Sequence, residues 1–205
     1  MTDTPDPTCP PAHLQHGIAV LRRHAFSALL ADGTPSLADL AEAASRDAVG
    51  VAQAIAWLEA TGALERAGDR LVGAHGLTRR PTPHTITIGD RTLHTWCAFD
   101  AVAIPVALAA SARATTTCPS CNRALFVDVR DGNLPDHSDL VLWLPGGECR
   151  NVIADFCAHA NLFCRAEHLA TWRSVAADPP GRTLPLADVP ALAVVEWADV
   201  AQTLR

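Results

Sequence analysis

The pattern of apolar residues changes near residue 80, and this change constrains the fold more than any other feature of the chain. Before it, apolar residues recur at helical spacing, as in residues 13–31. After it, short alternating segments are separated by turn residues, which is typical of strands and hairpins. Residues 80–83, with the sequence Arg-Pro-Thr-Pro, form the natural linker between the two parts. We therefore predict an α+β protein with a disordered leader over 1–12, a helical domain over 13–80 and a mixed α/β domain over 84–205.

The helical domain has the outline of a winged helix. Ser36 begins its second helix, and Asp39 stands at the position that completes a capping box. A hairpin that turns at Gly68-Asp69 follows the third helix. Three helices and a hairpin within about 70 residues predict this outline. The expected bounds are 13–31, 36–44 and 46–60 for the helices and 64–72 for the hairpin.

Winged helices are common DNA readers, but the charge of this part argues against that role. Residues 1–84 contain seven Arg against nine Asp and Glu, and the whole chain has a formal net charge of −6. A protein that reads DNA normally neutralises several phosphates with basic side chains. We therefore predict a module that packs on the second part and covers its site, without a nucleic acid partner.

The second part begins with a hairpin that delivers Trp96 and Cys97. Its strands are 85–88 and 92–95, with a turn at Gly89-Asp90. An apolar helix is expected to follow. The remaining predicted elements are a helix over 98–110, strands over 125–129 and 140–144, helices over 151–163 and 166–176, and a buried strand over 191–195 before a closing helix.

The composition excludes several kinds of chemistry. All 16 basic residues are Arg, and the chain has neither Lys nor Tyr, which excludes Schiff-base and pyridoxal chemistry, a Walker-type phosphate loop and a tyrosine acid or base. Its seven Cys cannot all pair within one chain, so we expect free thiols in a reducing cytoplasm. Residues 1–11 do not resemble a secretory signal. The longest apolar run, 101–112, is too short to span a bilayer.

Two segments place thiols where they could act on a substrate. Cys97 and Asp100 stand at i and i+3, so on a helical turn they share one face and form a nucleophile–acid pair. A buried cysteine beside a surface carboxylate is the alternative. Cys157 is a second thiol in an apolar segment. We expect His159, two residues later, to be a structural hydrogen-bonder rather than a ligand or base.

Cys118-Pro-Ser-Cys121 has the spacing of half a zinc site or of a redox pair. No second such pair exists, so Cys149 and Cys157, or nearby His, would have to complete a zinc site, and the spacing of these two cysteines is unusual. A knuckle-like turn with one or both thiols buried is preferred to structural zinc at Cys118 and Cys121. Three further cysteines have no partner at a meaningful spacing and are assigned no role: Cys9, Cys149 and Cys164.

Several of these segments together resemble the organomercurial (alkylmercury) lyase family. The sequences WCAFDAVAIP (96–105) and FCAHANLF (156–163) match its two cysteine segments, Cys118 precedes a short turn and a strand, and Trp172 follows in the next helix. The resemblance covers residues 85–200 well and the helical part by architecture only. It implies a winged-helix-like part on a mixed α/β core, and cleavage of carbon–mercury bonds.

The resemblance also implies roles for individual residues. Cys97 and Cys157 bind mercury, and Asp100 handles the proton and is a candidate third contact to the metal. Cys118 looks structural, and Cys121 departs from the family pattern. No tightly bound cofactor is implied. The substrates are small organomercurials, and external thiols or a mercuric reductase take over the Hg(II) product. The chain is expected to be a monomer or homodimer without a membrane partner.

The chemistry explains why these residue types are needed. Mercury is soft, and thiolate is the softest ligand that a side chain offers. A second thiolate on a two-coordinate mercury pushes electron density onto the carbon, which can then accept a proton. An apolar wall should raise the pKa of Asp100. Trp96, Phe99, Phe156 and Phe163 are candidates for that wall, although aromatic residues at such spacings also form plain core. The alternative function is a thiol protein that binds or senses metal without cleaving anything.

Overall fold

The computed structural model describes residues 10–46, 48–135, 139–176 and 179–201. Most of the predicted leader, together with Cys9, lies outside these residues. Of the remainder, Ala12 already begins a short 3-10 helix, η1 (Ala12–Leu14). None of the helices in the described part of the chain combines the length and the apolar character needed to cross a membrane.

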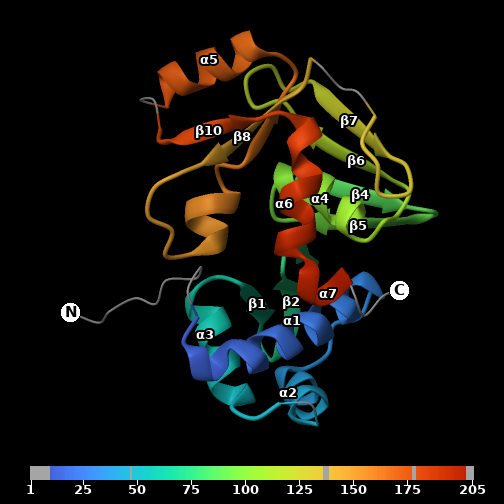
Figure 1. Cartoon of the computed structure of the whole chain (residues 1–205), viewed down its shortest axis with the longest axis vertical. Helices are drawn as coiled ribbons and strands as arrows, with labels where there is room; N and C mark the ends of the chain where they lie inside the picture. Colours follow the sequence, from blue (N-terminus) through green and yellow to red (C-terminus); the bar gives the residue numbers. More distant parts are fainter. Residues whose placement is uncertain (1–9, 47, 136–138, 177–178, 202–205) are drawn as a thin grey trace.

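The first part contains three helices followed by a hairpin, in the predicted order (Figure 1). The capping box at Ser36 is confirmed: its hydroxyl accepts from the Asp39 N–H at 3.0 Å, and the Asp39 carboxylate accepts from the Ser36 N–H at 3.2 Å. The hairpin turns at Gly68-Asp69 as predicted. The elements are α1 (Gln15–Leu30), α2 (Leu37–Ser45), α3 (Val51–Ala60), β1 (Leu64–Ala67) and β2 (Arg70–Ala74).

The third helix is shorter than predicted. It begins at Val51 rather than at residue 46, because Gly50 stands before it with a φ of +72°. A left-handed residue cannot continue the helix on its amino-terminal side. The first turn of the predicted helix over 46–60 is therefore absent from α3.

A seven-stranded antiparallel sheet runs through both parts of the chain. Its order is β1-β2-β3-β5-β4-β6-β7, so the strands before and after residues 80–83 belong to one sheet. The predicted hairpin over 85–95 is confirmed, whereas β6 was not predicted. The remaining strands of this sheet are β3 (Leu77–Thr78), β4 (Thr85–Ile88), β5 (Arg91–Thr95), β6 (Ala112–Thr117) and β7 (Ala124–Val129).

A three-stranded antiparallel sheet with the order β10-β8-β9 forms a second layer. Helix α5 packs against its strands at one end of the molecule (Figure 1). The closing segments then run back along the molecule. The elements are β8 (Val141–Pro145), β9 (Asn161–Phe163), α5 (Ala166–Val175), β10 (Gly181–Leu184), η3 (Leu186–Asp188), α6 (Val189–Glu196) and α7 (Ala198–Ala201).

Helix α4 (Ala98–Ala107) lies at the centre of the fold. It contacts strands of both sheets and packs along α6 (Figure 1). All ten of its residues are buried, including Asp100, which fits a helix that is apolar around its whole circumference. Pro105 lies inside its last turn. The structure thus places the Cys97–Asp100 segment at the start of a helix that is shielded on every side.

Two predicted elements are wrong. Residues 151–163 form a wide π-type turn, η2 (Val152–Cys157), followed by the strand β9, instead of one helix. Residues 191–195 belong to the helix α6 instead of a buried strand. Val189, Ala193 and Trp197 are buried at a spacing of four, whereas Val194 and Val195 are 63% and 76% exposed. One buried face at helical spacing, and not alternation, therefore governs this segment.

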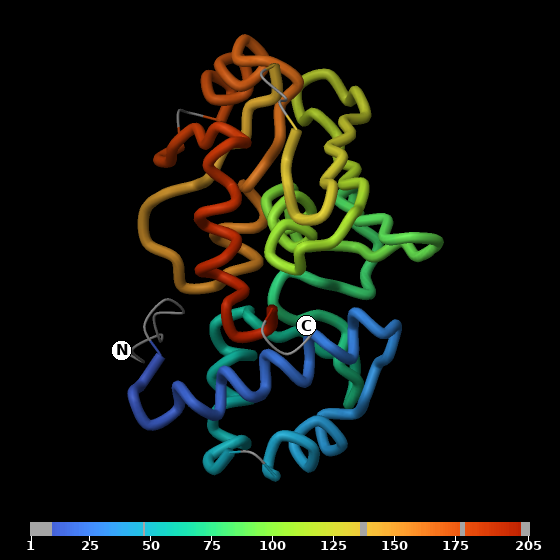
Figure 2. Tube along the Cα trace, turned by 45° about the vertical axis from the view of Figure 1, so that its right-hand side comes forward, coloured from blue at the N-terminus to red at the C-terminus, as the bar shows by residue number. Residues whose placement is uncertain are grey.

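The carboxy-terminal helices of the described chain pack on the first part. Figure 2 shows the carboxy-terminal helices, in red, descending onto the blue helix α1, and α7 packs against α1. The amino-terminal helices, the central helix α4 and the carboxy-terminal helices therefore surround a common interior. The α+β class predicted from the sequence is confirmed by the antiparallel sheets and the helices that cover them.

Candidate active site

Cys97 and Asp100 form the amino-terminal cap of α4. The backbone N–H of Cys97 donates to Asp100 Oδ2 at 3.2 Å, and the Asp100 N–H points at Cys97 Sγ at 3.5 Å. The Cys97 thiol also donates to Asp100 Oδ2, at 3.1 Å. This is the geometry of a capping box with sulfur in place of a hydroxyl. Helix formation itself therefore brings the thiol and the carboxyl together.

Cys157 reaches the same carboxyl from the last position of η2. Its thiol donates to Asp100 Oδ2 at 3.8 Å. The segment is fixed on both sides, because the Val152 N–H donates to the Thr61 carbonyl at 2.8 Å and the Ala98 N–H donates to the Ala160 carbonyl at 3.2 Å. The two sulfurs and a carboxyl oxygen all lie within 4.8 Å of one another, and all three residues are buried.

The surroundings raise the pKa of all three groups. Burial raises the pKa of Asp100 to about 7, and the charge of Glu196 adds to this, while hydrogen bonds from the two thiols act in the opposite direction. Burial also raises the pKa of Cys97. The pKa of Cys157 is raised well above its usual value by its hydrogen bond to Cys97 and by burial. Cys97 and Cys157 are therefore protonated thiols at neutral pH when no substrate is bound.

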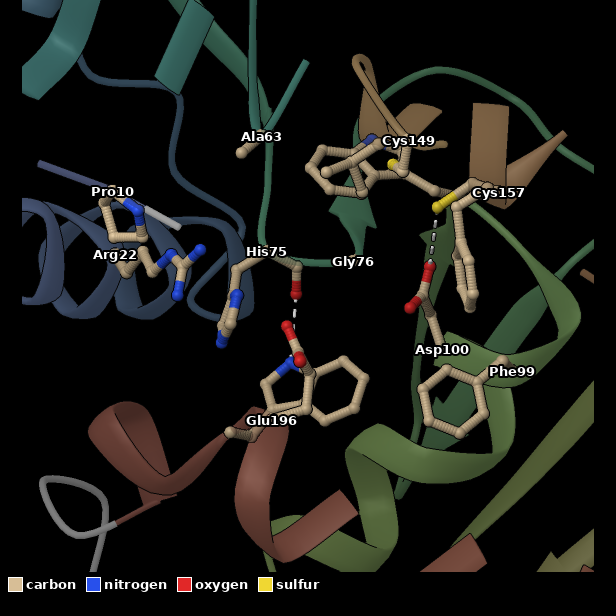
Figure 3. A pocket seen from close by; sticks show the side chains of 14 residues that line it. Pro10, Arg22, Ala63, His75, Gly76, Phe99, Asp100, Cys149, Cys157 and Glu196 are labelled. Atoms are coloured by element: carbon tan, nitrogen blue, oxygen red, sulfur yellow. Dashed lines mark hydrogen bonds between the residues drawn. The ribbon is translucent and has the colours of Figure 1, made fainter. Parts of the chain in front are cut away.

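A cavity of about 370 Å³ opens beside this cluster. Asp100 and Cys157 line it and face each other in Figure 3, whereas Cys97 does not line the cavity and is completely buried. Much of the wall is apolar, as predicted for Trp96, Phe99 and Phe156. The exception is Phe163, which packs against Trp172 with 5.6 Å between ring centroids and does not line the cavity.

The other side of the cavity carries polar groups from distant parts of the chain. Figure 3 shows Arg22 and His75 across from Asp100, with Glu196 close to His75. Arg22 comes from α1, His75 from the connection between β2 and β3, and Glu196 from the end of α6. Together with Trp197, these lining residues were missed by the sequence reasoning, because no local motif marks a residue that reaches a site through tertiary packing.

Other predicted candidates lie outside the cluster. His159 is exposed and follows η2, and it is absent from the cluster that Cys97, Asp100 and Cys157 form. Cys149, to which no role was assigned, lines the cavity. Cys97 and Cys157 therefore contact the Asp100 carboxyl, whereas Cys149 lies in the same cavity without joining the cluster.

Two further residues join the Cys118–Cys121 turn: Cys164, to which no role was assigned, and His168. Cys164 and His168 bring their ligand atoms within 4.8 Å of the two sulfurs. Of the groups considered for completing a zinc site, Cys149 and Cys157 do not join the turn, since Cys157 belongs to the other cluster and Cys149 to neither, whereas a histidine does. Cys118 is fully buried and Cys121 is exposed, which agrees with a turn that buries one or both thiols.

Comparison with known proteins identifies the family of the chain. The family model described as MerB, alkylmercury lyase, matches residues 77–197, which include both cysteine segments and Asp100. The chain belongs to the alkylmercury lyase family. The match begins in β3, at the middle of the large sheet, and ends at Trp197 in the cavity wall.

Individual alkylmercury lyases match different shares of the chain. The enzyme of Pseudomonas putida is 28% identical over 102 residues, which is 48% of this chain and 48% of that protein. The enzyme of Streptomyces lividans is 28% identical over 165 residues, which is 78% of this chain and 74% of that protein. The matched region thus spans about half of the first relative and three quarters of the second.

A solved structure extends the likeness of fold to nearly the whole chain. It is described as the mercury-bound form of MerB2, and it superposes with a TM-score of 0.77 at 22% identity. The alignment covers 93% of this chain and 92% of that one. The alkylmercury lyase fold therefore includes the helical first part, beyond the region that the family model matches.

Proposed function

We propose that this protein is an organomercurial lyase that cleaves the carbon–mercury bond by protonolysis. The observation that carries the proposal is the convergence of two thiols and one carboxyl, buried together at the wall of a cavity. Soft thiolates suit mercury, and a carboxyl with a pKa near 7 can both accept and donate a proton. The proposed substrates are small organomercurials.

In the first step, one site thiol replaces the exchangeable ligand of the mercury. A sulfur–mercury bond forms, the thiol proton leaves with the displaced ligand, and the carbon–mercury bond is still intact. Cys157 lines the cavity and Cys97 lies behind it, so an incoming substrate first meets Cys157. The apolar wall excludes bulk water from the bound organic group.

In the second step, the remaining thiol transfers its proton to Asp100 and its sulfur bonds to mercury. Both thiols donate to the same oxygen, Asp100 Oδ2, so either proton has a direct path to the carboxyl. Asp100 then protonates the carbon as its bond to mercury breaks. The hydrocarbon leaves, and Hg(II) stays bound to the sulfurs of Cys97 and Cys157, with Asp100 as a third contact.

The product must then pass to another thiol carrier, because two sulfurs hold Hg(II) tightly. External thiols or a mercuric reductase are the proposed acceptors, and no tightly bound cofactor takes part in the cleavage. A reducing cytoplasm suits this chemistry, since Cys97 and Cys157 are free thiols and must remain so.

We assign a covering role to the first part, with its winged-helix-like order of elements. Arg22 and His75 of this part line the cavity, which supports a contribution to the pocket rather than to DNA binding. We propose that residues 13–80 and 84–205 act as one catalytic unit, as a monomer or homodimer.

Headspace detection of benzene tests the proposed function. With phenylmercury and excess external thiol, the wild type should release benzene, whereas Cys97→Ser and Cys157→Ser should release none above the thiol background. Cys149→Ser removes a thiol that lines the cavity but lies outside the cluster, so it should retain measurable cleavage. Unchanged turnover in Cys97→Ser would contradict the proposal. Stoichiometric mercury binding by the wild type without any hydrocarbon would instead support a metal-binding protein.

A further inference from the structure

A second cluster of sulfur and nitrogen ligands lies away from the cavity. Cys118 and Cys121 come from the turn between β6 and β7, Cys164 follows β9, and His168 lies in the first turns of α5. Their four ligand atoms lie within 4.8 Å of one another. None of these four residues lines the cavity beside Asp100.

We propose that these four side chains form a structural zinc site. Zinc in structural sites is held tetrahedrally by four protein ligands, and three cysteines with one histidine are a standard set. Zinc–sulfur bonds of about 2.3 Å and zinc–nitrogen bonds of about 2.0 Å at tetrahedral angles put two sulfurs about 3.8 Å apart and a sulfur about 3.5 Å from the nitrogen.

The observed distances fit this tetrahedron. The sulfurs of Cys121 and Cys164 are 3.8 Å apart, and Cys118 Sγ lies 3.6 Å from His168 Nδ1. Cys164 Sγ lies 3.0 Å from the same nitrogen, so this pair must open by about half an ångström around the metal. Four protein ligands leave no coordination position for a substrate, which makes the site structural rather than catalytic.

The backbone around the cluster is already shaped to hold it. The Cys118 N–H donates to the Arg123 carbonyl and the Asn122 N–H donates to the Cys118 carbonyl, both at 2.9 Å, which closes a tight turn. The Ser120 hydroxyl donates to the His168 carbonyl at 2.7 Å and ties the two segments together. The ligands thus converge without rearrangement of the chain.

Zinc on His168 Nδ1 fixes the ring proton on Nε2. In the structure a guanidinium nitrogen of Arg165 lies 2.8 Å from Nε2, and two donors cannot share that contact. Arg165 is exposed, so its side chain is free to turn toward solvent when the metal binds.

The site joins the two sheets and is connected along the chain to the proposed active site. Cys118 and Cys121 belong to the turn of the seven-stranded sheet, whereas Cys164 follows the edge strand β9 of the three-stranded sheet. β9 in turn follows η2, which carries Cys157. Zinc therefore fixes the segment that presents one of the two substrate thiols.

Metal analysis of the reduced, purified protein tests the proposal directly. The wild type should carry about one zinc per chain after exhaustive dialysis. Cys121→Ser, which alters an exposed side chain, and His168→Ala should retain little zinc. His168→Cys should retain it, because it replaces a three-cysteine site with a four-cysteine site. Cys97→Ser is the matched thiol control and should keep the full zinc content whether or not the protein cleaves organomercurials.

Cobalt substitution gives a second readout that does not depend on activity. Cobalt added to the zinc-free protein should produce intense visible bands of tetrahedral geometry and thiolate-to-metal charge transfer, both absent in Cys121→Ser and shifted in His168→Cys. If the zinc-free wild type shows neither band after cobalt is added, the proposal is overturned. A disulfide between Cys121 and Cys164 that persists in protein purified under reducing conditions, detected by peptide mass spectrometry, would overturn it as well. Loss of zinc from Cys97→Ser to the same extent as from Cys121→Ser would also overturn it.

Discussion

At the scale of single residues, Asp100 is the group on which the proposed chemistry depends. Its carboxyl accepts hydrogen bonds from two thiols and from the Cys97 backbone, yet burial still raises its pKa to about 7. An ordinary aspartate with a pKa near 4 would be a poor acid at neutral pH. Burial therefore gives this carboxyl the proton affinity that a carrier between sulfur and carbon needs.

The raised pKa of Asp100 predicts a stability change with a definite sign. The folded protein binds this proton more tightly than the unfolded chain, so Asp100 costs stability as the pH rises from about 4 to about 7. Asp100→Asn removes the ionisable group and should raise the free energy of unfolding above pH 7, by up to about 4 kcal/mol for a shift of about three units. Denaturant unfolding at several pH values measures this gain, which should vanish below about pH 4.

Asp39 provides the opposite control. Hydrogen bonds from Ser36 lower the pKa of this exposed capping residue, so its contribution is present above pH 4 and is lost as the pH falls. Asp39→Asn should therefore lower the stability at neutral pH. If Asp100→Asn also lowered the stability at pH 8, the raised pKa assigned to Asp100 would be wrong.

At the scale of elements, the first turn of α4 packs closely against Gly76 in the connection between β2 and β3. Gly76 has a φ of +92°, and a Cβ at this position would lie 3.0 Å from Asp100 Cγ and 3.1 Å from Ile104 Cδ1. Its carbonyl also accepts from the Trp96 N–H at 2.9 Å. A glycine is therefore required where this connection passes the carboxyl.

Gly76→Ala should displace the Asp100 carboxyl and reduce benzene release at least tenfold. Gly89→Ala is the matched control, because Gly89 also has a positive φ, +60°, but no other described atom lies within 4 Å of a Cβ there. Both changes add backbone strain of about 1–2 kcal/mol. Only Gly76→Ala touches the site, so equal cleavage rates in the two variants would contradict the assigned packing.

The elements that could be predicted from the sequence are those with local signals. Gly-Asp turns marked both hairpins, and Ser36 with Asp39 marked a helix start. The run Ala-Leu-Ala-Val-Val at 191–195 was mistaken for a strand because a short apolar run fits either a buried strand or a helix. Its burial against α4 decided the outcome, and that contact is not visible in the local pattern.

At the scale of the whole molecule, Trp197 connects the three parts that enclose the cavity. It is almost fully buried, and its ring packs against His75 and Phe99, with centroids 5.5 Å and 5.8 Å apart. Its indole N–H donates to the His75 carbonyl at 3.0 Å. One side chain thus joins the carboxy-terminal helices to the first part and to α4.

Trp197→Phe should destabilise the protein by about 1 kcal/mol more than Trp143→Phe. Both rings are buried and lose similar volume, but the Trp143 N–H has no hydrogen-bond partner among the described residues. Trp197→Phe in addition leaves the buried His75 carbonyl without its donor. Chemical denaturation of the two variants measures the difference, and an equal loss of stability would show that the hydrogen bond contributes nothing.

Long-range assembly also marks the limit of what the sequence could predict for the sites. Cys97 and Asp100 stand three positions apart, so their pairing followed from helical spacing alone. Cys157 entered through the family resemblance, since it lies 57 positions from Asp100. Cys164 and His168 were not predicted to lie beside Cys118, because residues 151–163 were predicted to form one helix. In the structure this segment is η2 followed by the strand β9, and β9 leads directly to Cys164.

The most direct test of the central claim is single-turnover benzene release by Asp100→Asn loaded with phenylmercury. Asparagine keeps the shape of the carboxyl but cannot carry a proton from thiol to carbon. The account predicts that this variant still binds one phenylmercury per chain, while benzene release slows by about 10²–10⁴-fold relative to the wild type. Benzene release at the wild-type rate would contradict the role of Asp100 as the proton carrier.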